Sequence, residues 1–164
     1  PDVLAGFAHH HKTSKPIAKD LVLRMRAANE FGKGVHVMRQ LFYTAYSFFM
    51  HNRDPANLDL DKYSEEIFKG YSPYRNIPET YVYSNFGHLI GYSSMYYTYQ
   101  WSLVIAKDLF TLFEKGGLLN EDISARYRQK ILEPGGTKDA ADLVEDFLGR
   151  PAQMDAYKKW LQGN

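Results

Sequence analysis

At 164 residues, the chain has the length of one domain or of one compact piece of a larger one. It contains no cysteine, which excludes disulfide frameworks, thiolate metal sites and cysteine nucleophiles. A net charge of +1 gives no broad electrostatic footprint, and no apolar run approaches the roughly 20 residues that span a bilayer, so we expect no nucleic-acid partner and no membrane association.

The chain starts Pro1-Asp2-Val3-Leu4, without an initiator Met and without a basic-then-apolar signal segment. We interpret the sequence as a piece of a longer protein. The lack of cysteine favours a cytoplasmic location.

Helical periodicity predominates from the N-terminus onward, and no segment alternates as a strand does, so the sequence predicts an all-α fold. Residues 1–11 are typical of the end of a helix. A helical pattern then covers residues 17–51, and Gly32 and Gly34 favour a break into two helices. The apolar stripe expected to face the core comprises Leu21, Met25 and Ala28, then Val37, Leu41, Ala45 and Phe48.

The middle of the chain predicts a short amphipathic helix over 60–71 and a proline-containing linker after it. Residues 85–92 form a glycine-bearing junction. A long helix is expected over 93–115, buried because apolar positions cover most of its circumference, and Gly116-Gly117 ends it.

Three short helices are expected at the end of the chain, at about 121–132, 138–148 and 151–162. Pro134-Gly135-Gly136 predicts the turn between the first two. Thr137 is the expected N-cap of the second.

Histidine is the first candidate for metal chemistry, but the pattern is poor. No His is followed by Glu, so H-E-x-x-H is absent. His9, His10 and His11 are adjacent, and neighbouring side chains on a helix diverge by about 100°, so we interpret them as a polar helix end. We expect no metal ligands in this chain.

The strongest local signal is a tyrosine cluster at 92–99, within a chain that has 13 tyrosines. If a helix begins near Ser93, Tyr92, Tyr96 and Tyr99 project from one side of it, with His88 just before them. These neutral donors suit a developing oxyanion or a peptide carbonyl. Tyrosines at helical spacing also pack cores, and the pattern alone leaves that alternative open.

The segment Gly87-His88-Leu89-Ile90-Gly91-Tyr92-x-x-x-Tyr96-Tyr97-x-Tyr99-x-Trp101-Ser102 resembles the tyrosine-rich loop and helix of the thimet oligopeptidase/oligopeptidase A family of zinc metallopeptidases. Further similar motifs occur in the family's order over essentially the whole chain. They are Asn29-x-Phe31, Arg39-Gln40-Leu41-Phe42, Tyr127-Arg128-x-x-Ile131-Leu132-x-Pro134-Gly135-Gly136, Asp139-Ala140 and Phe147-Leu148-Gly149-Arg150.

The resemblance implies that residues 1–164 are the C-terminal part of a helical zincin-type catalytic domain. Residues 1–92 would lead to the substrate-binding loop, and 93–164 would hold the tyrosine-rich helix and the C-terminal helices. The full-length parent would use zinc to hydrolyse short peptides, as a metalloendopeptidase or peptidyl-dipeptidase, while this chain would supply no zinc ligand and be inactive alone.

By the same resemblance, Tyr99 and Tyr92 are the expected catalytic donors to the oxyanion, and His88 and Tyr96 bind the peptide main chain. One departure stands out, because Ile90-Gly91 occupies a place where many members have two glycines. We expect the loop before Tyr92 to be less permissive for that reason.

Two other hypotheses remain at this stage. In the first, the chain is a non-catalytic helical module, derived from such a peptidase, that binds peptides or another protein. In the second, the isolated chain self-associates through apolar surface that the remainder of the catalytic domain normally covers.

Overall fold

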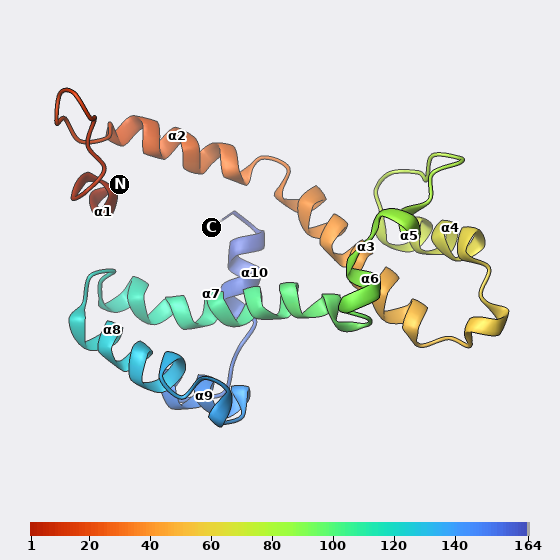
Figure 1. Cartoon of the computed structure of the whole chain (residues 1–164). Helices are drawn as coiled ribbons and strands as arrows, with labels where there is room; N and C mark the ends of the chain where they lie inside the picture. The colour runs from red at the N-terminus through yellow and green to blue at the C-terminus, as the bar shows by residue number, and fades with distance from the viewer. Residues whose placement is uncertain (164) are drawn as a thin grey trace. The chain divides into compact units, whose positions relative to one another are not determined.

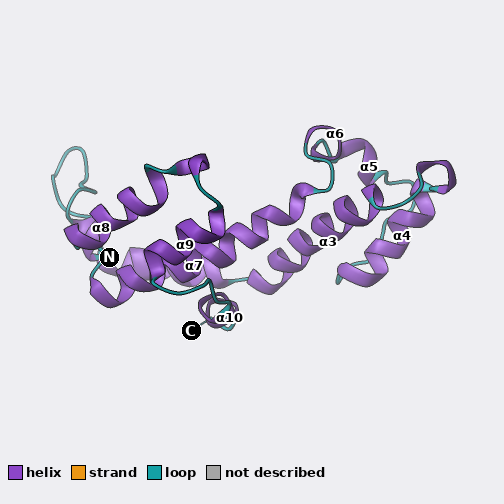
Figure 2. Cartoon of the chain, turned by 90° about the horizontal axis from the view of Figure 1, so that it is seen from below, coloured by secondary structure: helices purple, strands orange, loops and turns teal. Residues whose placement is uncertain are grey.

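The computed structural model describes residues 1–163, and its regular structure is helical throughout that range, which confirms the all-α prediction (Figures 1 and 2). Ten α-helices lie within the described residues. The only β-type pairing there is a single bridge between His9 and Pro16.

The N-terminal segment contains one helical turn, α1 (Asp2–Ala5), rather than a helix to residue 11. The prediction was wrong because the backbone turns back on itself: the N–H of His10 donates to the carbonyl of Lys15, and Ser14 has φ = 53°. His10 Nδ1 accepts from the N–H groups of Lys12 and Thr13, each at 3.3 Å, so this imidazole stabilises the turn.

The expected break near Gly32 is confirmed. Helix α2 (Lys19–Glu30) ends just before it, α3 (Lys33–His51) begins just after it, and Gly32 has the left-handed φ of 71° that favours glycine.

The predicted apolar stripe is only partly correct. On α2 the buried residue is Val22, while Leu21 and Met25 are 41% and 53% exposed. On α3, Val37 and Ala45 are buried as expected, but Leu41 and Phe48 are exposed. The buried face of α3 includes the aromatic residues Phe42 and Tyr46, which were not part of the predicted stripe.

The chain divides into two compact units, and residues 34–104 form one of them. Its core joins α3 to α4 (Leu60–Tyr71) and to the segment that follows, through Phe42, Tyr46, Tyr63, Ile67, Phe86 and Tyr96. Helix α4 has the predicted bounds, and the Asp59 carboxylate caps it by accepting from the N–H groups of Asp61 and Lys62.

Two four-residue helical turns, α5 (Val82–Asn85) and α6 (His88–Gly91), occupy the predicted junction. The long helix α7 (Thr98–Gly116) begins five residues later than expected, because Ser93 has φ = 47° and a 3₁₀ turn over Met95–Tyr97 follows. It ends at Gly116 as predicted, with Gly117 at φ = 103°. The expected burial of this helix was wrong, since Trp101 is 52% exposed and Phe110 45% exposed.

The second unit comprises residues 1–33 together with the chain from 105 onward. Its core packs α7 against α9 (Ala140–Leu148) through Leu109, Val144 and Phe147. Between them come α8 (Glu121–Tyr127), a π-helical turn over Arg128–Leu132 and a 3₁₀ turn over Gly135–Thr137. Helix α10 (Asp155–Leu161) follows.

The N-cap of α9 is Asp139 rather than the predicted Thr137. The Asp139 carboxylate accepts from the N–H of Ala141 at 2.9 Å. Thr137 instead donates its hydroxyl hydrogen to the Pro134 carbonyl and stays within the preceding turn.

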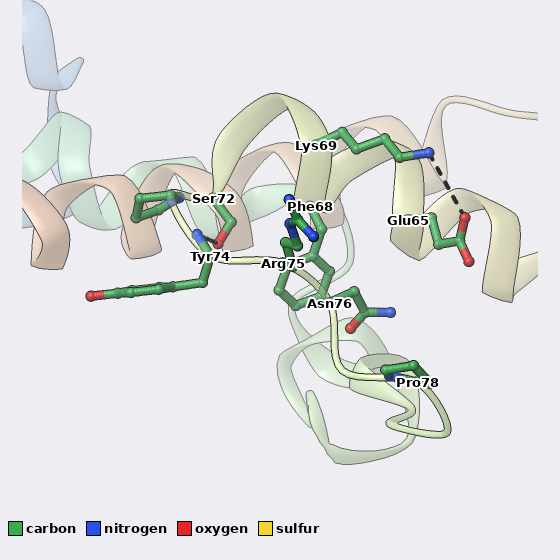
Figure 3. Close-up of a pocket in the computed structure, with 9 residues that line it drawn as sticks. Glu65, Phe68, Lys69, Ser72, Tyr74, Arg75, Asn76 and Pro78 are labelled. Atoms are coloured by element: carbon green, nitrogen blue, oxygen red, sulfur yellow. Dashed lines mark hydrogen bonds and ion pairs between the residues drawn. The ribbon is translucent and has the colours of Figure 1, made fainter.

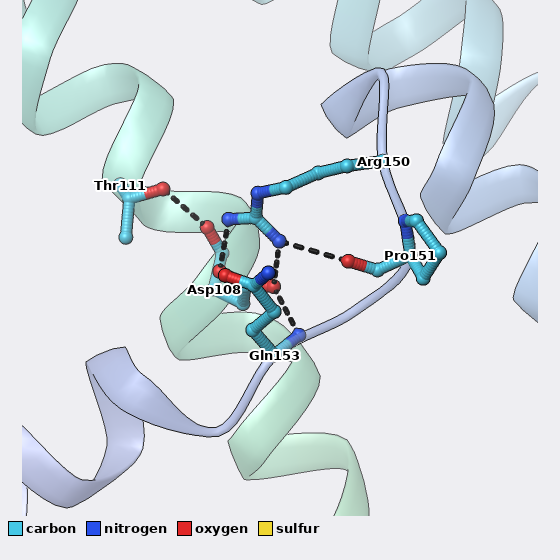
Figure 4. A network of polar contacts seen from close by, with 5 residues as sticks. All are labelled: Asp108, Thr111, Arg150, Pro151 and Gln153. Carbon is cyan, nitrogen blue, oxygen red and sulfur yellow. Dashed lines mark hydrogen bonds and ion pairs between the residues drawn. The ribbon is translucent and has the colours of Figure 1, made fainter.

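An ion pair with a buried carboxylate holds α7 to the segment after α9 (Figure 4). Arg150 donates to both carboxylate oxygens of Asp108 at 2.6 and 2.8 Å, and the N–H of Gln153 donates to the same carboxylate at 2.7 Å. Asp108 is 2% exposed. The Arg150 guanidinium holds the pKa of Asp108 below the usual range. Its hydrogen bonds favour the ionised carboxylate more strongly than the burial of Asp108 disfavours it.

Candidate functional site

The structure brings together the four residues singled out in the sequence. The His88 ring lies 5.1 Å from the ring of Tyr96 and 5.8 Å from that of Tyr99, measured between centroids, and Tyr92 lies 6.0 Å away. Tyr92 stacks on Tyr99 at 5.6 Å, and Tyr96 meets Tyr99 edge-on at 4.9 Å. We call these four residues the His–Tyr cluster.

The local geometry differs from the single helix face that the spacing suggests. His88 belongs to α6, Tyr92 ends that turn, Tyr96 lies in the 3₁₀ turn and Tyr99 is the second residue of α7. The chain reverses between them at Ser93, whose left-handed backbone is uncommon for a residue other than glycine. The hydroxyl of Ser47, a fully buried residue of α3, donates to the Ser93 carbonyl and thereby anchors the bend.

Tyr96 is the buried member of the cluster, at 9% exposure. Its ring packs on Tyr43 and Phe86, and its hydroxyl donates to the side-chain oxygen of Gln40 at 3.1 Å. Burial raises the pKa of Tyr96, with a smaller contribution from Tyr43, so the phenol stays neutral. This donor proton is already engaged, while the phenol oxygen can still accept a hydrogen bond.

Tyr99 and His88 form the exposed side of the cluster. The Tyr99 hydroxyl lies 3.3 Å from His88 Nε2, within hydrogen-bonding distance. Tyr99 is 46% exposed and Tyr92 36%, so both side chains are accessible to a ligand. A hollow of about 270 Å³ opens beside His88 and Tyr96; it is also lined by Tyr43, Val82, Asn85, Phe86 and Gly87.

Three supporting residues were missed by sequence reasoning: Gln40, Ser47 and Arg39. Arg39 donates to the Tyr43 hydroxyl at 3.1 Å, one ring away from Tyr96. The motif Arg39-Gln40-Leu41-Phe42 was the available signal for two of them. Ser47 gave none, because a serine within a helical pattern has no distinctive spacing.

A larger hollow, about 450 Å³, lies at the end of α4 and the linker after it (Figure 3). Phe68, Tyr74, Arg75 and Pro78 line it, and Lys69 is paired with Glu65 at 3.9 Å. None of its lining residues belongs to the His–Tyr cluster. We therefore place the candidate site at the cluster and not at this hollow.

Among residues 1–163, no three His, Asp or Glu side chains are grouped so that they could hold a metal ion. No helix in the same range is both long and apolar enough to cross a bilayer.

The chain is thus an all-helical peptide whose candidate site gathers one imidazole and three phenol groups. The model of Peptidase family M3 matches residues 1–163. The chain therefore belongs to this family of peptidases.

Similar curated proteins carry peptidase names. The chain is 31% identical over 156 residues to the thimet-like oligopeptidase of Dictyostelium discoideum, which covers 93% of this chain and 23% of that protein. Oligopeptidase A of Escherichia coli is 30% identical over 160 residues, covering 95% and 24%. The human mitochondrial intermediate peptidase is 28% identical over 158 residues, covering 94% and 22%. The chain thus spans less than a quarter of the length of these relatives.

Proposed function

We propose that this chain is part of a zinc-dependent oligopeptidase that hydrolyses peptide bonds in short peptides, as a metalloendopeptidase or a peptidyl-dipeptidase. Membership of Peptidase family M3 and the relatives named oligopeptidase support this proposal. The chain's own contribution is the His–Tyr cluster, which forms one wall of the substrate cleft. The remainder of the catalytic domain is its structural partner, and short peptides are its substrates.

The zinc ligands belong to the remainder of the protein in this proposal. The described side chains do not fit a zinc site, since they include no suitable group of three ligands. The isolated chain is expected to bind no stoichiometric zinc and to hydrolyse no peptide; metal analysis that found one tightly bound zinc per chain would contradict this.

The observation that carries the proposal is the pairing of the exposed Tyr99 hydroxyl with His88 Nε2 at 3.3 Å. A phenol fixed in this way is oriented before substrate arrives, and such a preorganised donor stabilises an oxyanion without later rearrangement. Tyr99 and Tyr92, whose rings stack, are the proposed oxyanion donors. His88 and Tyr96 are proposed to bind the peptide main chain, with the Tyr96 oxygen available to a peptide N–H because its own proton goes to Gln40.

The test is Tyr99→Phe in the full-length protein. Removing one oxyanion donor is expected to lower kcat by about 10²-fold with little change in KM, because the lost hydrogen bond forms mainly in the transition state. Steady-state kinetics on a short peptide measure both constants. An unchanged kcat would remove Tyr99 from this role.

Tyr97→Phe is the matched control. Tyr97 lies two residues away and is equally exposed, at 45% against 46% for Tyr99, and it makes no ring contact with the cluster. It should keep the wild-type kcat.

The non-catalytic alternative is tested separately by the full-length sequence: an upstream H-E-x-x-H supports the peptidase, and its absence favours a binding module. A cytoplasmic location and self-association of the isolated chain stay predictions.

A further inference from the structure

Arg39 is a cation close to the His–Tyr cluster that has no acidic partner among residues 1–163. Its guanidinium donates to the Tyr43 hydroxyl at 3.1 Å and lies 5.6 Å from the centroid of that ring. Two other basic residues of the same unit are paired with carboxylates: Arg53 with Glu66 at 2.8 Å, and Lys69 with Glu65 at 3.9 Å. Arg39 is exposed and therefore able to receive a carboxylate from a ligand.

The position of Arg39 relative to the cluster follows from ring contacts. The Tyr43 ring lies 5.6 Å from the Tyr96 ring, which lies 5.1 Å from the His88 ring. The positive charge of Arg39 also opposes the rise in the pKa of Tyr96, so the two groups share one electrostatic environment. An extended peptide advances about 3.3 Å per residue, so a bound peptide of no more than about five residues can reach from His88 to Arg39 along these ring contacts.

A recess beside Arg39 has the character of a side-chain pocket. It measures about 450 Å³, and its walls are largely apolar and aromatic, with Phe42, Tyr43, Phe68 and Val82 among them. Tyr43 and Val82 also line the hollow at His88, so the two spaces adjoin along the same residues. Ligand pockets commonly combine apolar walls with a few polar groups that fix orientation.

We propose that this recess is a specificity subsite for the end of a peptide, which presents an apolar side chain to the aromatic walls and a carboxylate to Arg39. The inference rests on the proposed peptidase function. The carboxylate comes from either the free C-terminus of a short peptide or an acidic side chain near its end. A guanidinium held in place by Tyr43 binds either group through charge-assisted hydrogen bonds.

The experiment uses the full-length protein and three peptides of one core sequence that end in leucine. The first has a free C-terminus, the second has a C-terminal amide, and the third has the amide and a glutamate before the leucine. The wild type is expected to bind the first, the third or both at least 10-fold better than the second, mainly through KM. Preference for the first alone identifies the terminal carboxylate, and preference for the third identifies the side chain.

Arg39→Gln should abolish that preference, and Arg39→Lys should restore part of it, because a lysine keeps the charge without the two-pronged geometry. Lys62→Gln is the charge-matched control: it removes one positive charge from an exposed site on α4, paired with Asp59, and should leave the preference unchanged. Circular dichroism and thermal melts check that each variant is folded.

Two results would overturn the subsite: a wild type indifferent to the three C-termini, or an Arg39→Gln variant that keeps the wild-type preference. A wild type that hydrolyses none of the peptides would contradict the proposed function instead. In that case, equilibrium binding of the same labelled peptides to the wild type and to Arg39→Gln decides the subsite by the same criteria.

Discussion

The bend beside the His–Tyr cluster depends on a serine and not on the neighbouring glycine. Gly91 lies in the right-handed turn α6, and a Cβ built on it would meet nothing within 4 Å. The left-handed residue is Ser93, held by Ser47. The Ile90-Gly91 departure from the two-glycine pattern therefore falls at a position where this backbone does not require glycine.

Gly91→Ala is accordingly expected to stabilise the chain by about 0.5 kcal/mol, because alanine restricts the unfolded chain at no steric cost in the folded one. Gly149→Ala is the matched contrast. Gly149 also has no neighbour within 4 Å of its Cβ position but has φ = 74°, so alanine there should cost about 1 kcal/mol. Urea denaturation measures both, and a loss of stability in Gly91→Ala equal to that in Gly149→Ala would refute the distinction.

At the scale of single elements, the start of α9 depends on Asp139. Its carboxylate satisfies an N–H in the first turn that has no partner within the helix, whereas Thr137 bonds back to Pro134. Asp139→Ala should therefore cost about 1 kcal/mol of unfolding free energy. Thr137→Ala should cost clearly less, and the reverse order in thermal or urea denaturation would restore Thr137 as the cap.

Local chemistry explains why some elements were predictable and others were not. Helix α4 has a capping aspartate before it and an amphipathic pattern within it, so its bounds follow from adjacent residues. The start of α7 cannot be read from adjacent residues, because the apolar pattern continues unbroken through Tyr92 and Tyr96. The bend at Ser93 depends on a hydroxyl 46 residues earlier in the chain, which no local pattern reveals.

The burial of α7 was overestimated for a related reason. An aromatic helix surface predicts burial, but the sequence pattern does not identify the element that covers this surface. Trp101 and Phe110 stay exposed in this chain. In the proposed full-length enzyme, the remainder of the catalytic domain is the partner for such surface.

At the scale of the whole molecule, the grouping of His88, Tyr92, Tyr96 and Tyr99 was predictable because all four lie within twelve residues of each other. Gln40 and Arg39 were not assigned to the site, since the hydrogen bond from Tyr96 to Gln40 joins residues 56 positions apart. Long-range contacts of this kind require the fold itself. The resemblance to a family identified the motif but not its connection to the tyrosines.

The Asp108–Arg150 pair gives the C-terminal motif Phe147-Leu148-Gly149-Arg150 a structural role. Phe147 is fully buried in the core, Gly149 ends α9 with a left-handed backbone, and this bend delivers Arg150 to Asp108, 42 residues earlier in the chain. The motif therefore combines core packing, the end of a helix and an ion pair within four residues. Stability should therefore depend on the ionised carboxylate of Asp108.

Asp108→Asn should destabilise the protein by about 2 kcal/mol at pH 7, because it removes the charge of a buried carboxylate that accepts three hydrogen bonds, while the Arg150 guanidinium, 35% exposed, keeps part of its hydration. The pKa of Asp108 is lowered in the folded state, so the carboxylate's contribution is complete above the unfolded pKa of about 3.9 and is lost as pH falls through the folded value. The difference between wild type and variant should then shrink as pH falls from 7 to 3, because below about pH 3.9 the unfolded chain takes up a proton at Asp108 more readily than the folded protein does. Asp146→Asn, which breaks the exposed pair with Lys138, serves as the control and should have a much smaller effect at pH 7. Urea denaturation across this range measures both variants, and a difference for Asp108→Asn that stays constant with pH would show that packing, and not the ionised pair, holds the segment after α9 to α7.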